Sequence, residues 1–118
     1  MLHKKLEAWK KSMDLSVKIF RVTEKFPASE RYGLSRQMRK CSISVPSNIS
    51  EGAARKSTKE LIHFQYISLA SLTELETQLI VSQRLGFINE GDNTLLDEVT
   101  QIRRLIQSSI RKLEQKLK

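Results

Sequence analysis

Residues 57–84 constrain the fold more than any other part of the chain, because they read as one long helix that is apolar on most of its circumference. Leu61, Phe64, Leu72, Leu75 and Leu79 follow helical spacing and define its main core face, with Ser68 in register. Further apolar side chains fall on its other faces: Ile62, Tyr66, Ile67, Leu69, Ile80 and Val81. A helix of this kind must be covered on most sides. We therefore expect a helical bundle, and a second partner surface beyond what one small bundle supplies.

Three other segments have helical periodicity. Residues 4–26 carry two neighbouring apolar rows, which together form a wide stripe: Leu6, Trp9, Met13, Val17, Phe20 and Leu15, Ile19, Val22, Phe26. Residues 33–55 carry a stripe through Leu34, Met38, Cys41, Val45, Asn48 and Gly52. The last segment follows a cap at Asn89 or Asp92, and its core face has Leu95, Val99, Ile102, Ile106, Ser109 and Leu113.

The boundaries between these segments are also visible. Pro27 ends the first helix, a Ser57–Glu60 capping box opens the third, and Gly86 caps its end. Few residues favour strands, and 118 residues suit one domain. The sequence predicts an all-α fold over residues 1–118, an up-down-up-down antiparallel four-helix bundle.

Residues 42–52, which read SISVPSNISEG, interrupt the helical pattern. Pro46 removes one backbone hydrogen bond and displaces the carbonyl of Ser42. Either the second helix continues with a kink near Pro46, or it breaks and restarts there; the stripe on both sides favours the kink. Serines 42, 44 and 47 could satisfy the freed backbone groups.

The net charge of +8 is concentrated in the first half of the chain. Residues 1–56 carry thirteen basic and five acidic side chains, whereas residues 57–86 carry two basic and three acidic ones. An excess of this size suits anionic partners such as nucleic acid. No apolar run is long enough to span a bilayer, so we expect no membrane association and a cytoplasmic protein.

The residues offer little for catalysis. Glu60 and His63 match one Glu-x-x-His motif, but a di-metal bundle needs two, and the other histidine, His3, lacks the preceding glutamate. Cys41 is the only cysteine and lies on a core stripe, where a buried thiol is typical. Glycine-rich phosphate loops are absent from the sequence. We therefore expect a protein that is not an enzyme, with no catalytic residues, no metal and no cofactor.

Two sets of residues are candidates for binding. The nucleic-acid-binding candidates are basic side chains on the second helix, at the joint that follows it, and on the fourth helix: Arg36, Arg39, Lys40, Arg55, Lys56, Lys59, Arg103 and Arg104. For any single one, a solvated surface charge is the alternative interpretation. The oligomer-interface or polar-joint candidates are Ser47, Asn48, Glu51, Ile67, Ser71, Glu74, Gln78 and Val81. The last five have coiled-coil spacing, and Asn48 and Glu51 are natural partners for Glu74.

Residues 31–87, most specifically 44–52 and 71–78, resemble the four-helix bundle proteins encoded by 23S rRNA intervening sequences, and the opening LEAWKKSMDL is similar to that family's first helix. The resemblance implies a five-subunit ring. It also implies kinship with the accessory proteins of diversity-generating retroelements, which are basic, pentameric and bind reverse transcriptase and nucleic acid. It brings no catalytic residues.

Two hypotheses of function follow. The first is a basic homo-oligomer, implied to be a pentamer, that binds RNA or an RNA–protein complex. The second is an oligomeric scaffold that binds a protein partner, with the basic charge serving only solubility.

Overall fold

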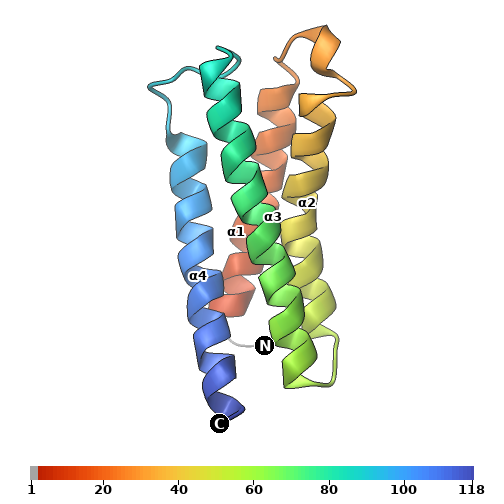
Figure 1. The fold of residues 1–118 in the computed structure, drawn as a ribbon, viewed down its shortest axis with the longest axis vertical. Coiled ribbons are helices and arrows are strands. Elements are labelled where there is room, and N and C mark those ends of the chain that lie inside the picture. The colour runs from red at the N-terminus through yellow and green to blue at the C-terminus, as the bar shows by residue number, and fades with distance from the viewer. Residues whose placement is uncertain (1–2) are drawn as a thin grey trace.

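The computed structural model describes residues 3–118, with side chains from Lys5 onward, and within them it has helices and no strand. The elements are α1 (His3–Thr23), the 3₁₀ helix η1 (Ala28–Glu30), α2 (Leu34–Ala53), α3 (Thr58–Arg84) and α4 (Thr94–Lys116). The predicted all-α, four-helix fold is confirmed. The four long helices lie side by side and successive ones run in opposite directions, joined by short connections (Figure 1).

The helices form a closed ring of contacts. Each packs against its neighbours in sequence, and α1 also packs against α4, whereas α1 and α3 lie diagonally opposite, as do α2 and α4. The bundle measures 48 × 26 × 18 Å. Its axis is filled by aliphatic side chains from all four helices, among them Ile19, Val45, Leu75 and Ile102.

The wide apolar stripe predicted for the first helix is only half correct. Leu15, Ile19 and Phe26 of the second row are buried, but in the first row Val17 is 48% exposed and Phe20 37% exposed. The reason is geometric: α1 touches only α2 and α4, and these two neighbours cannot cover both rows. Two residues of the first row therefore lie on the surface, while Leu6, Trp9 and Met13 are half-buried.

Pro46 does not break α2, which continues from Leu34 to Ala53 with the proline buried inside it. The alternative of a broken and restarted helix is therefore wrong. The Ser42 carbonyl, which the proline leaves without its helical donor, lies 2.9 Å from the Ser16 hydroxyl of α1. The hydroxyl group that satisfies it thus comes from the neighbouring helix, and not from serines 42, 44 or 47.

Both predicted ends of α3 are confirmed. The Ser57 side chain accepts a hydrogen bond from the Glu60 amide at 3.3 Å. Gly86, with φ of +78°, follows the last turn in the left-handed region that favours glycine. At Gly52, α2 passes so close to α3 that an added Cβ would lie 2.9 Å from Cβ of Phe64. The close approach of α2 and α3 at this point therefore depends on a residue with no side chain.

Candidate nucleic-acid interface

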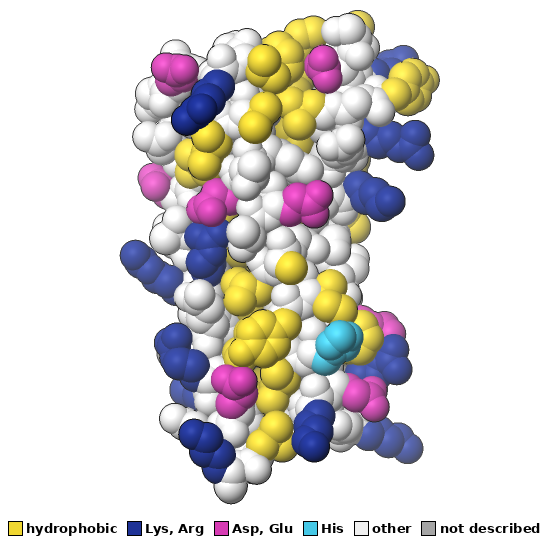
Figure 2. All heavy atoms as spheres, viewed as in Figure 1, with side chains coloured by type: hydrophobic (Ala, Val, Ile, Leu, Met, Phe, Trp, Pro, Cys, Tyr) yellow, Lys and Arg dark blue, Asp and Glu magenta, His cyan; other side chains and the backbone are white. Residues whose placement is uncertain are grey.

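The eight basic candidates divide into two groups. Arg39, Arg55 and Arg103 bind other parts of the chain. The rest are exposed, and the structure gives them no ion pair within the residues it describes: Arg36, Lys40, Lys56, Lys59 and Arg104. Basic side chains gather on both flanks of the α3 face, over α2 on one side and α4 on the other (Figure 2).

Arg39 links α2 to the end of α1. Its Nε donates to Thr23 Oγ1 at 2.8 Å, and its Nη2 donates to the Phe20 carbonyl at 3.1 Å. The guanidinium also lies 4.9 Å from the centre of the Phe20 ring, within the range of a cation–π contact. Arg39 is thus held in one orientation before any ligand arrives.

Arg55 links the end of α2 to the start of α3. Its guanidinium is 2.5 Å from the Glu51 carboxylate and 3.8 Å from that of Glu60, and it lies over the Phe64 ring. Glu51, expected to meet Glu74 or a neighbouring subunit, is therefore occupied by Arg55. The unpaired charges at this joint are Lys56 and Lys59, beside the first turn of α3.

Arg103 joins α4 to α3 through a two-pronged pair with Glu76, at 3.0 and 3.1 Å. This geometry uses the fork of the guanidinium and fixes the two helices relative to each other. It leaves Arg104, the next residue along, as the exposed cation of that pair of candidates.

The polar joint in residues 42–52 is a hydrogen-bond network between α2 and α3. The hydroxyls of Ser44 and Ser71 lie 2.9 Å apart. Asn48 donates to the Ser44 carbonyl at 2.8 Å and lies 3.0 Å from its hydroxyl, while the Cys41 thiol donates to the Ser71 carbonyl at 2.9 Å. Within the chain Asn48 therefore binds Ser44 and not Glu74, and Ser47 is exposed.

Cys41 is a buried thiol, 7% exposed, as its place on the core stripe predicted. Burial, followed by the nearby Glu74 carboxylate, raises the pKa of the Cys41 thiol to about 12. A nucleophilic cysteine needs a lowered pKa and access to solvent. The chemistry at Cys41 is that of an inert core residue.

The five-residue row on α3 does not lie on one exposed face. Glu74 and Val81 are exposed, Ile67 and Ser71 are half-buried, and Gln78 is buried. Ser71 is directed into the groove between α2 and α3, where it meets Ser44. The role of this row in subunit contacts remains a prediction.

An apolar groove on α1 and α2 was missed by sequence reasoning. It is shallow, about 520 Å³ in volume, and its apolar lining includes Met13, Val17, Phe20, Ile43 and Pro46. The signal was present as the extra apolar row of the first helix. What the sequence did not reveal is that Met13, Val17 and Phe20 of this row share a groove with the exposed Ile43 and the buried Pro46.

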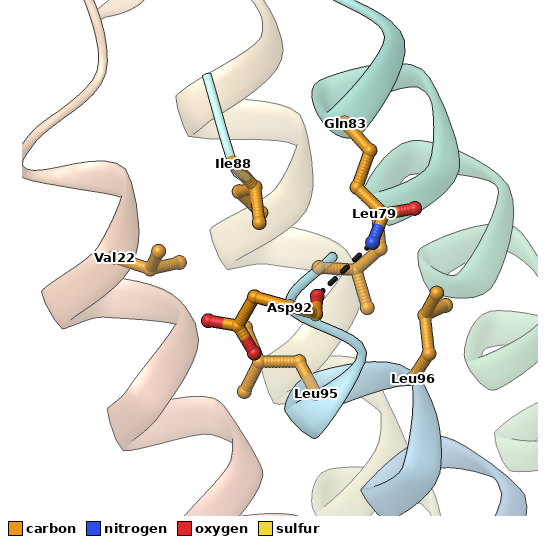
Figure 3. A pocket seen from close by; sticks show the side chains of 7 residues that line it. All are labelled: Val22, Leu79, Gln83, Ile88, Asp92, Leu95 and Leu96. Carbon is orange, nitrogen blue, oxygen red and sulfur yellow. Dashed lines mark hydrogen bonds between the residues drawn. The ribbon is translucent and has the colours of Figure 1, made fainter. Parts of the chain in front are cut away.

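A small cavity of about 30 Å³ lies where the α3–α4 connection folds back on the bundle (Figure 3). Apolar side chains surround it, among them Leu79, Ile88 and Leu95, and Gln83 Nε2 donates to the Asp92 carbonyl at 3.0 Å beside it. This is room for about one water molecule. The cavity is too small for a substrate, and the Gln83 bond is a structural clamp on the connection.

In the described part of the chain, no three His, Cys, Asp or Glu side chains lie together in a way that could hold a metal ion. His63 is exposed and its ring contacts Phe64 edge-on, while Glu60 faces Arg55. From His3 onward, none of the helices has the length and apolar surface needed to cross a membrane.

The fold and surface define a class: a basic, all-helical bundle with unpaired cations on its flanks. The sequence matches the 23S rRNA-intervening sequence protein family over residues 4–108, and the chain belongs to that family. The resemblance drawn from residues 31–87 is thereby confirmed.

Among solved structures, the chain is similar to a protein of unknown function from the S23 ribosomal protein family of Bacteroides thetaiotaomicron. The TM-score is 0.83 at 24% identity, and the alignment covers 92% of this chain and 98% of the other. At this identity, the similarity shows that the two proteins share a fold and nothing further. Comparison with curated proteins found no match.

Proposed function

We propose that the protein is a non-enzymatic RNA-binding protein that contacts the sugar–phosphate backbone through the unpaired cations on its flanks. The observation that carries this proposal is the separation of the basic residues into two groups. Arg55 and Arg103 are neutralised by carboxylates, but Arg36, Lys40, Lys56, Lys59 and Arg104 are not. Unpaired surface cations release counterions from RNA when they bind phosphates, which is the main source of backbone affinity.

The family description names intervening sequences of 23S rRNA and assigns these proteins no ligand. The shape of the surface favours backbone contacts over base readout. Aromatic side chains that stack on unpaired bases are few in this chain, and two of them, Phe20 and Phe64, are already covered by Arg39 and Arg55.

The proposal is tested by charge reversal at the α2–α3 joint. Lys56→Glu with Lys59→Glu is expected to weaken binding to a fluorescein-labelled RNA stem-loop at least tenfold, measured by anisotropy. Lys10→Glu with Lys25→Glu changes the net charge equally at exposed positions of the first helix and its C-terminal turn, and is the matched control. Equal losses in the two variants would show that net charge alone, and not this surface, attracts the RNA.

The second candidate function is an oligomeric scaffold, with self-association as its first step. The observation that favours it is the apolar groove on α1 and α2, because apolar patches of this kind often mark contact sites between proteins. A homo-oligomer, with the five subunits that the resemblance implies, would cover this groove. The two functions are compatible if subunit contacts use the groove and RNA contacts use the basic flanks.

A further inference from the structure

A cleft of about 440 Å³ lies at the end of the bundle where α1 ends, η1 follows and α2 begins. In Figure 1 this is the end at which the orange connection joins the two helices. The residues that line the cleft include two arginines, Arg31 and Arg39, together with Ser35, Thr23 and Glu24. Its volume falls in the range of small-ligand sites in proteins.

Arg39 is prepared to bind an anion there. Thr23 Oγ1 and the Phe20 carbonyl accept from Nε and Nη2, and Thr23 is fixed in turn because its hydroxyl lies 2.6 Å from the Ile19 carbonyl. The Nη1 hydrogens of Arg39 have no acceptor within the residues that the structure describes. A guanidinium held in this way loses little side-chain entropy when it binds a ligand.

Ser35 adds a hydroxyl group to the cleft. The residue lines the cleft and is 4% exposed overall, and its hydroxyl forms no hydrogen bond with the described residues, so it is available to donate to a ligand. Ser35 also lies in the first turn of α2, and Gly33, the residue before this helix, offers no side chain to cap its amides. The Leu34 amide of this turn already faces the Glu30 carboxylate.

The charges around the cleft remain positive in sum. Glu24 is the one carboxylate in its lining, and it forms no ion pair with Arg31 or Arg39. The Glu30 carboxylate lies outside the lining and is directed at the Leu34 amide, 3.4 Å away. Phe26, which also lines the cleft, packs on Phe87 with ring centres 5.2 Å apart.

We infer that this cleft binds a phosphate group, and that in the complex it holds one phosphate of the RNA backbone. The inference rests on the proposed function for its source of phosphate. The Nη1 hydrogens of Arg39, the guanidinium of Arg31 and the Ser35 hydroxyl are donors, which is what the oxygens of a phosphate accept. The cleft would thus bind one phosphate at a defined position, in addition to the electrostatic attraction between the RNA backbone and the unpaired cations on the surface.

The experiment compares inorganic phosphate and RNA as probes of the full-length protein. Phosphate is expected to shift the amide NMR signals of Arg31, Ser35 and Arg39 with one saturating curve. Arg31→Gln combined with Ser35→Ala is expected to weaken phosphate binding about tenfold and stem-loop RNA binding at least threefold. Lys25→Gln removes one charge at an exposed site outside the cleft and is expected to leave phosphate binding unchanged.

The two proposals fail in different ways. If RNA binds but the cleft variant behaves like Lys25→Gln and phosphate shifts no cleft signal, the cleft is not a phosphate site while the proposed function stands. If phosphate saturates the cleft but RNA does not bind, the assignment to RNA and the proposed function are both overturned. Since Arg31 is exposed, Arg31→Gln alone keeps the test valid if the double variant unfolds.

Discussion

Gly52 shows how a single missing side chain can set the distance between two helices. An added Cβ would lie 2.9 Å from Phe64 Cβ, closer than Cβ atoms approach other atoms in proteins, and 3.2 Å from the Leu61 carbonyl oxygen, which is a tight contact. The helix preference of alanine over glycine, about 1 kcal/mol, acts in the other direction. We expect the crowding to outweigh the helix preference, so that the substitution destabilises the protein. The reason is that the Leu61 backbone cannot move away as a flexible side chain can.

We therefore predict that Gly52→Ala lowers the free energy of unfolding by roughly 1–3 kcal/mol, the usual cost of overpacking. Urea unfolding followed by circular dichroism measures it. Ser50→Ala, at an exposed position of the same helix, is the control and should change stability by less than about 0.5 kcal/mol. A Gly52→Ala protein as stable as the control would mean that α2 and α3 are not in close contact there.

Cys41 is expected to be nearly unreactive in the folded protein. With its pKa raised to about 12 from 9.0, the thiolate population at pH 8 falls by roughly a thousandfold, and burial also limits access. An aromatic disulfide reagent should label the native protein far more slowly than the protein unfolded in guanidinium. Labelling at the unfolded rate would contradict the buried position of this thiol.

At the scale of elements, the continuity of α2 depends on a group that α1 supplies. The Ser16 hydroxyl lies 2.9 Å from the Ser42 carbonyl and 3.0 Å from that of Ser12, so it can donate to either. Only the Ser42 carbonyl lacks a helical donor, because Pro46 has no N–H. A buried carbonyl without any donor costs about 1–3 kcal/mol.

A double-mutant cycle tests this link. Ser16→Ala should lower the free energy of unfolding by about 1–2 kcal/mol in the natural chain. In a Pro46→Ala background the restored amide can bind Ser42, so Ser16→Ala should cost clearly less. The same cost in both backgrounds would rule out the proposed compensation between α1 and α2.

The start of α4 should be sensitive to acid. Asp92 accepts from the Thr94 amide at 3.1 Å, and its hydrogen bonds with Thr94 lower the pKa of its carboxyl below the ordinary 3.8. A lowered folded-state pKa adds stability that is complete above the ordinary pKa and is lost as the pH falls through the folded-state value. Asp92→Ala should therefore be less stable than the natural chain at pH 6, and the difference should shrink in strong acid. A difference in thermal unfolding that is independent of pH would contradict this account.

The positions and ends of the helices could be predicted from the sequence better than the side of each helix that is buried. Four helices, the Ser57 cap and Gly86 follow from local rules that need no tertiary contact. The buried side of α1 does not follow from such rules, because both of its rows are apolar and only the positions of α2 and α4 select between them. Some interior serines, such as Ser12 and Ser82, also escape sequence patterns, since the same residue type is common on surfaces.

The candidate site was predictable by residue type but not by pairing. Basic side chains were visible in the sequence, yet the carboxylate that neutralises Arg103 lies 27 positions away on another helix. The cleft with Arg31 and Ser35 arises from the fold of the α1–η1–α2 connection, and no spacing in the sequence announces it. Interactions of this kind become visible only when the whole bundle is assembled.

For the whole molecule, we predict self-association through exposed apolar surface. Light scattering should find a mass several times the 13.6 kDa of one chain. Val17→Asp in the groove and Ile67→Glu on α3 should each lower that mass, because a charge at a subunit contact would lose its hydration. Leu117→Glu, at an exposed apolar residue of the chain end, is the control. A natural chain that is monomeric at all concentrations would contradict the prediction.

The central claim is that the unpaired cations bind RNA through several phosphates at once. Its most direct test is the affinity of the natural protein for a labelled RNA stem-loop, measured by anisotropy across a series of potassium chloride concentrations. Contacts to four or more phosphates predict that log K falls against log salt with a slope steeper than about −3. Binding that does not change with salt, or no binding at low salt, would contradict the claim.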